Sequence, residues 1–254
     1  PGLGLIFLLA LGAIYSGTLI SRLWTIAHHR KIVAEKYGDL GRCAYGEQGE
    51  RVVNFVTYFY ISIVTVVFHL TSAESLQTVF YDVGGDRCLW EYSFFVVLMV
   101  LPLGQIRSLA NVSYLAIIGA VTIVGTVLIA VVRLVSNGPL EGAETVLVNT
   151  TDHNARAKVN TLVLIVFSYC GQAIFAELIS SMQTPADFPK AVWSSTITMC
   201  SSYILIASVG YYILGQFAIA PVTDALPEDP WAQVANVLLF AHVLIAYIIE
   251  LNIL

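Results

Sequence analysis

The sequence has few charged residues. Asp, Glu, Lys and Arg make up 11% of its 254 residues, whereas hydrophobic residues make up 57%. A soluble domain has about 25% charged residues. The shortage excludes an ordinary soluble domain and indicates a chain that lies in a membrane. The net charge of −5 does not determine the orientation, because orientation follows the placement of Lys and Arg.

Motifs of enzymes and metal sites are also missing. The four cysteines lie in different regions without CxxC spacing, which argues against a metal site or a disulfide scaffold. The glycines form no phosphate-binding loop, and neither a nucleophile elbow nor HExxH occurs. We therefore expect that the chain is not an enzyme, binds no cofactor or metal, and has no nucleic-acid partner.

What the chain does have is seven long apolar segments. A helix needs about 20 apolar residues to cross a bilayer, and no segment alternates as the strands of a membrane barrel do. The third segment is short and ends at Pro102-Leu103-Gly104, so we expect it to tilt or to end early. We predict an all-α polytopic membrane protein, with residues 1–254 forming one transmembrane domain that is incomplete at both ends. The predicted spans are 3–27, 52–80, 92–106, 112–135, 161–182, 191–219 and 232–254.

The placement of Lys and Arg predicts the orientation. If the first span runs from outside to inside, eight of these residues lie inside and four outside, and the loop 28–51 faces the cytoplasm. If the N-terminus of the full-length protein is cytoplasmic, such a first span predicts at least one earlier helix. The sequon at Asn149 then lies outside and the sequon at Asn111 inside.

We expect glycosylation of Asn149 and none of Asn111 in a eukaryotic host, because only outside loops meet the glycosylation machinery. Asn149→Gln should abolish the shift in mobility that an endoglycosidase removes, and Asn111→Gln should leave that shift intact. Loss of the shift in the Asn111→Gln variant would reverse the predicted orientation.

Four stretches together resemble the amino acid/auxin permease family, in the same order and over nearly the whole chain. They are Tyr37-Gly38-Asp39-Leu40-Gly41 with Ala44-Tyr45-Gly46-Glu47; Leu101-Pro102-Leu103 with Leu109 and Ser113; the segment 167–190; and Trp231, Ala235-Asn236, His242 and Tyr247. Each motif is weak alone, and the ordered set is specific.

The resemblance implies about eleven helices in the inverted-repeat architecture of the bacterial leucine transporter, of which the chain holds about helices two to eight. It implies secondary active transport of amino acids by alternating access, coupled to a proton or sodium ion. Alternatives are an auxin-type carboxylate permease and an amino-acid-sensing receptor on the same fold. The membrane would be the plasma membrane or a vacuolar or lysosomal membrane.

The fifth apolar segment carries polar residues in its middle, in FSYCGQAIFAE at 167–177. Discontinuous membrane helices expose backbone groups and helix ends to substrate and ions. With the family match, this segment predicts a substrate site formed by Ser168, Tyr169, Gly171 and Gln172. The alternative is that Gly171 is a packing contact and Gln172 bonds a neighbouring helix.

Coupling needs another group, because the family often has histidine where this chain has Gln172, and glutamine cannot titrate. Glu177 lies about 140° around an unbroken helix from Gln172, so it either pairs with a donor elsewhere or carries coupling protons. The family motif favours His242 as a second coupling residue, against a hydrogen-bonded packing role. Asn236 and Tyr247 share one helix face, with His242 turned away, and are predicted to contact substrate.

Overall fold

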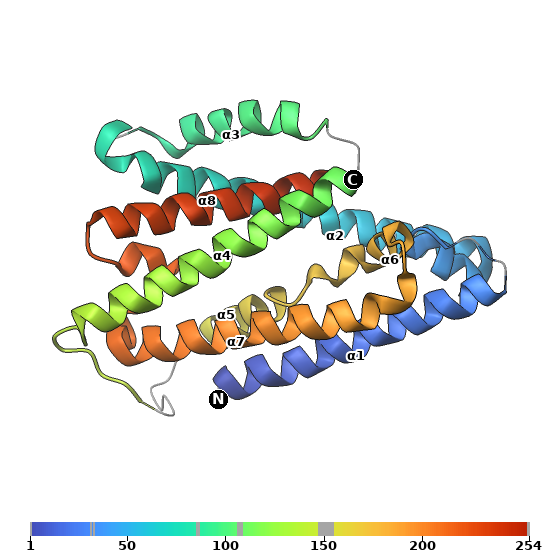
Figure 1. Ribbon diagram of the computed structural model, residues 1–254, viewed down its shortest axis with the longest axis horizontal. Helices are drawn as coiled ribbons and strands as arrows, with labels where there is room; N and C mark the ends of the chain where they lie inside the picture. Colours follow the sequence, from blue (N-terminus) through green and yellow to red (C-terminus); the bar gives the residue numbers. More distant parts are fainter. Residues whose placement is uncertain are drawn as a thin grey trace. The chain divides into compact units, whose positions relative to one another are not determined.

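The computed structural model describes residues 2–30, 32, 34–84, 87–105, 109–146 and 155–252 (Figure 1). All regular secondary structure in these residues is helical. The α-helices are α1 (Gly2–His29), α2 (Tyr37–Gly84), α3 (Leu89–Leu103), α4 (Leu109–Asn137), α5 (Ala155–Phe167), α6 (Phe175–Ser181), α7 (Phe188–Leu214) and α8 (Pro230–Leu251). Short 3₁₀ turns are η1 (Gly171–Ile174), η2 (Pro185–Asp187), η3 (Gly215–Phe217) and η4 (Val222–Ala225).

Six helical stretches of the described residues are long and apolar enough to cross a membrane. The apolar helix α3 has 15 residues and ends at Leu103, one residue after Pro102 and just before Gly104. This agrees with the early end expected from the Pro-Leu-Gly sequence. The prediction of an all-α polytopic membrane protein is confirmed, whereas an inverted repeat of about eleven helices stays a prediction.

Contacts within the chain divide it into two units, and each is described by itself. Unit 1 contains residues 1–60 and 146–204, and unit 2 contains residues 61–145 and 205–254. The helices α2 and α7 both pass from one unit to the other. The expected single transmembrane domain stays a prediction.

Unit 1 is built from α1, the first part of α2, the α5–α6 segment and most of α7. One buried cluster joins Ala10 and Ala13 of α1 to Tyr169 and to Cys200 of α7. A second joins Ile179 of α6 to Phe188 and Val192. At Gly17 of α1 a Cβ atom would lie 2.9 Å from Val192 Cγ1. The absence of a side chain there lets α1 and α7 approach each other closely.

The region 28–51, predicted as a loop, is helical again from Tyr37, so the loop prediction is wrong for that part, and the cytoplasmic placement stays a prediction. The helix reverses at Tyr45 and at Gly46, where φ is 66° and ψ is −156°, a conformation that favours glycine. The two arms touch through their backbones, since a Cβ on Gly41 would lie 2.8 Å from the Gly49 carbonyl oxygen. Gly41 and Gly46 of the family motif, together with Gly49, therefore build a tight helical hairpin, which spacing alone does not reveal.

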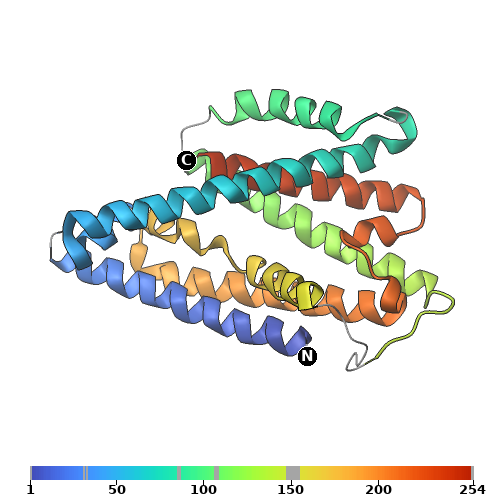
Figure 2. The ribbon, with the colours of Figure 1, turned by 180° about the vertical axis from the view of Figure 1, so that it is seen from behind.

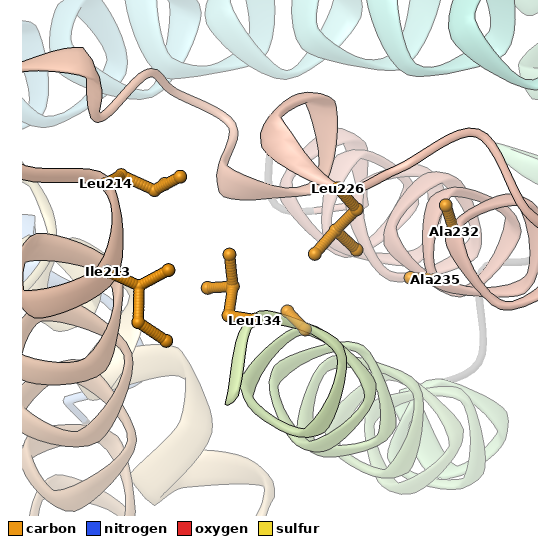
Figure 3. Close-up of a cluster of buried hydrophobic side chains, with 7 residues drawn as sticks. Leu134, Ile213, Leu214, Leu226, Ala232 and Ala235 are labelled. Atoms are coloured by element: carbon orange, nitrogen blue, oxygen red, sulfur yellow. The ribbon is translucent and has the colours of Figure 1, made fainter. Parts of the chain in front are cut away.

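Unit 2 is centred on α4 and α8, which lie side by side (Figures 1 and 2). Small residues on α4 allow this, because Cβ atoms on Gly119 and Gly125 would lie 3.2 Å from side chains of α8. Figure 3 shows an apolar cluster near the C-terminal end of α4, where Leu134 lies between α7 and the segment leading to α8. Its buried members are Ala130, Leu134, Ile213, Leu214, Leu226, Ala232 and Ala235.

Candidate functional site

The fifth predicted span, 161–182, is not one continuous helix. The helix α5 ends at Phe167, the chain passes through η1, and α6 begins at Phe175, as Figure 2 shows. The backbone amides of Tyr169 and Cys170 bond carbonyls three residues back, at 3.1 and 3.0 Å, in place of the α-helical pattern. The interruption therefore falls within the FSYCGQAIFAE stretch, where the substrate site was predicted.

Tyrosine side chains donate hydrogen bonds to three backbone carbonyls at the interruption. The Tyr203 hydroxyl donates to the Ser168 carbonyl at 3.1 Å, and the Tyr60 hydroxyl donates to the Cys170 carbonyl at 3.0 Å. The Tyr37 hydroxyl donates to the Gln172 carbonyl. An unpaired carbonyl within a bilayer costs several kcal/mol, so these bonds allow the break to exist there.

The sequence left two roles open for Gly171 and Gln172: a substrate site, or contacts with neighbouring helices. Among the described residues, no atom lies within 4 Å of a Cβ built on Gly171, so this part of the chain makes no packing contact with the glycine. Its φ is not positive either, so the backbone at this position does not require glycine. The Gln172 Oε1 atom accepts a hydrogen bond from Ser16 of α1 at 2.9 Å, as the bonding alternative expects.

A cavity of about 360 Å³ adjoins the break within unit 1. Tyr60, Tyr169, Cys170 and Gln172 line it together with small and aliphatic residues of α1 and the break. None of the described lining residues is charged. The cavity therefore presents a neutral amide and hydroxyl groups beside the interrupted backbone.

Ser168 and Tyr169 differ in their surroundings. Ser168 is exposed, and its hydroxyl donates to the Leu164 carbonyl at 3.0 Å, so its side chain is satisfied by its own helix. Tyr169 is buried, and its ring packs edge-to-face on Tyr203 with centroids 5.6 Å apart. Of the two, only Tyr169 has a side chain that lines the cavity.

Glu177 lies on α6, half-buried, and one carboxylate oxygen has no hydrogen-bond partner in the described part of the chain. It interacts electrostatically with Lys36 and Asp39 at the start of the hairpin. The Tyr58 hydroxyl, 3.3 Å from Lys36 Nζ, raises the pKa of Lys36, so this residue stays positively charged. Glu177 thus interacts with the positive charge of a lysine from another segment of unit 1.

The predicted residues of α8 lie in unit 2. Asn236 is buried and lines a cavity of about 700 Å³ together with Thr223, Asp224 and Asp229. Tyr247 is also buried but packs in an apolar cluster with α3 and lies edge-on to His69, with centroids 5.7 Å apart. The two residues share the buried side of α8, but Tyr247 does not line the cavity at Asn236.

His242 is half-buried, and its Nδ1 lies 2.8 Å from the carbonyl oxygen of Gly119 on α4. A carbonyl only accepts hydrogen bonds, so Nδ1 carries the proton and Nε2 is the acceptor in the neutral ring. The contact fits the packing role that the sequence left open.

The structure thus brings five of the predicted residues together in unit 1. They are Ser168, Tyr169, Gly171, Gln172 and Glu177. The other three, Asn236, Tyr247 and His242, belong to unit 2. Asn149 lies outside the described residues.

Sequence reasoning missed Ser16, Tyr60 and Tyr203 as neighbours of the break. Tyr37 was noticed only as part of a family motif. A hydroxyl group within an apolar span was the available signal, because such a group needs a buried partner. The signal does not identify the partner, which lies 35 to 156 residues away in the sequence.

Comparison with known proteins agrees with this arrangement. The family described as transmembrane amino acid transporter protein matches residues 1–254. Amino acid transporter AVT1B of Arabidopsis thaliana is 26% identical over 237 residues, which cover 89% of this chain and 42% of that protein. Amino acid transporter AVT1C of the same plant is 25% identical over 250 residues, covering 92% and 44%.

Amino acid transporter AVT1J is 23% identical over 232 residues, covering 89% of this chain and 53% of its own length. The chain therefore spans about half the length of the curated relatives it matches. No solved structure matches it significantly. The resemblance found in the motifs is confirmed, and the family consists of transport proteins and not of enzymes. With its interrupted span and its motifs in order, the chain belongs to the transmembrane amino acid transporter protein family.

Proposed function

We propose that the protein is a secondary active transporter that moves amino acids across its membrane by alternating access. The observation that carries the proposal is the interrupted span of unit 1, whose non-helical backbone adjoins a cavity. Irregular backbone is tolerated at membrane depth only where it is buried in protein or lines a cavity. Transporters use such interruptions to bind substrate and ions.

The proposed substrate site is the break itself, with Ser168, Tyr169, Gly171 and Gln172. Ser168 contributes its backbone, because its hydroxyl is bonded within α5. Tyr169 and Gln172 contribute side chains to the cavity wall, and Gly171 leaves open space beside the backbone. We propose Asn236 and Tyr247 of unit 2 as further contributors, within a leucine-transporter-like inverted-repeat bundle of about eleven helices.

We further propose that transport is coupled to a proton or sodium gradient through Glu177 and His242. An acidic side chain within a span is costly and marks an ion or proton pathway. One carboxylate oxygen of Glu177 has no hydrogen-bond partner among the described residues, which supports a role in binding a proton or a cation. His242 keeps its Nε2 for a proton while Nδ1 is bonded to Gly119.

Amino acids are the proposed substrates because the three relatives are all named amino acid transporters. Reconstituted full-length protein should accumulate at least one of a panel of labelled amino acids, saturably and only under an imposed proton or sodium gradient. Binding without accumulation would indicate a receptor. Competition by indole acids would indicate an auxin-type carboxylate permease.

A further inference from the structure

The three carbonyls bonded by tyrosines are evenly spaced along the break. They belong to Ser168, Cys170 and Gln172, and among the described contacts the carbonyls of the residues between them accept no hydrogen bond from a tyrosine. In an unbroken α-helix these three oxygens would accept from the amides of Gln172, Ile174 and Ala176, four residues further on. The tyrosine hydroxyls therefore occupy the acceptors that a continuous helix would use.

The donors come from separate stretches of unit 1. Tyr203 lies on α7, Tyr60 lies on the long arm of α2, and Tyr37 is the first residue of the hairpin. Each hydroxyl reaches the break from a different stretch, so no single element imposes its geometry. The Gln172 carbonyl also accepts from the amide of Phe175, in the 3₁₀ pattern of η1. A carbonyl oxygen has two lone pairs, so it can hold both bonds.

This arrangement creates a competition between two ways to satisfy the same oxygens. With the hydroxyls present, the oxygens are paired while the segment stays non-helical. Without them, the Ser168 oxygen loses its hydroxyl donor and the Gln172 oxygen keeps only the 3₁₀ bond from the Phe175 amide, unless the segment rewinds and these oxygens accept from α-helical amides. Rewinding is the cheaper outcome, because it restores every lost bond within the chain.

We propose that Tyr37, Tyr60 and Tyr203 are positioning residues that hold the segment 168–172 out of helical geometry and so keep the substrate site formed before substrate arrives. They act on the backbone and not on the substrate. This inference rests on the proposed function only for its uptake measurement, because the geometry of the break can be measured without any transport.

Hydrogen exchange of the backbone amides in segment 168–178 tests the proposal directly. The full-length protein in lipid nanodiscs is compared with Tyr60→Phe, Tyr203→Phe and the variant in which all three tyrosines are Phe. We expect exchange of this segment to slow by about tenfold in the triple variant, and less in the single ones, as the amides of a rewound helix become protected. Unchanged exchange would overturn the proposal. So would faster exchange with a lowered melting temperature, since the tyrosines would then support packing alone.

Tyr15 offers a matched control, since it lies on α1 of the same unit with 69% of its surface exposed. Tyr15→Phe should change neither exchange nor uptake. In the single variants at Tyr60 and Tyr203 we expect KM for the transported amino acid to rise by about tenfold with the maximum rate within twofold, because only the formation of the site is affected. Slowed exchange with unchanged KM would uphold the positioning role and refute the break as the substrate site.

Discussion

Gly171→Val should reduce uptake by at least about tenfold while the protein folds and reaches its membrane. Among the described residues, no atom lies within 4 Å of the added Cβ, and φ at Gly171 is not positive, so this part of the chain accommodates a side chain there. Valine is stiff at χ1 and would fill the open space beside the break. Overpacking costs about 1–3 kcal/mol, and here that cost falls on the bound substrate, where about 1.4 kcal/mol is tenfold. Uptake kinetics measure the loss of transport, and thermal unfolding of the purified variant measures whether its stability is retained.

Gly17→Val is the matched control, because the same substitution meets a packed surface. Its Cβ would lie 2.9 Å from Val192 Cγ1 and 3.0 Å from Phe175 Cε2. We expect a loss of stability of about 1–3 kcal/mol from overpacking between α1 and its neighbours. The assignment of the break as substrate site would be refuted if Gly171→Val were unstable, or if it transported normally.

Glu177→Gln should remove gradient-driven accumulation and leave exchange of internal for external substrate intact. Glutamine has nearly the same shape as glutamate but can carry neither a coupling charge nor a coupling proton. One elementary charge that moves through 100 mV is worth about 2.3 kcal/mol, which corresponds to roughly fiftyfold accumulation. We expect accumulation to fall by about this factor. Substrate counterflow at zero gradient, measured in the same liposomes, should stay within twofold.

The competing role for Glu177 is a structural ion pair with Lys36. In that case Glu177→Gln and Lys36→Gln would both lower the melting temperature, and accumulation would still follow the gradient. Glu47 provides a control, since it is an exposed glutamate of unit 1 that lies outside the predicted spans. Glu47→Gln should change neither accumulation nor counterflow.

Much of the fold follows from composition, because an apolar segment in a bilayer must satisfy its backbone internally and the helix is the simplest solution. The end of α3 at Leu103 was predictable from the local sequence Pro-Leu-Gly. The hairpin from Tyr37 was not. Its stability depends on contact between Gly41 and Gly49 and on the Asp39 carboxylate, which accepts from the amides of Glu35 and Lys36 at 2.9 and 3.0 Å.

The candidate site was predictable to the same extent. Gly171, Gln172 and Glu177 were conspicuous because each is unfavourable in the middle of an apolar helix. The tyrosines that satisfy the break were not conspicuous, because a tyrosine is common in an apolar span. Tyr37 lies 135 residues from Gln172 in the sequence, and only the folded chain brings them into contact.

The neutral wall of the cavity in unit 1 has a consequence for how the protein should respond to acidity. Neither the amide of Gln172 nor the carbonyls of Ser168 and Cys170 gain or lose a proton in the physiological range. If the cavity is the proposed substrate site, we expect acidification of either compartment to leave the fit between cavity and substrate unchanged. A change in pH should then alter the rate and extent of the proposed accumulation and leave the substrate selectivity the same.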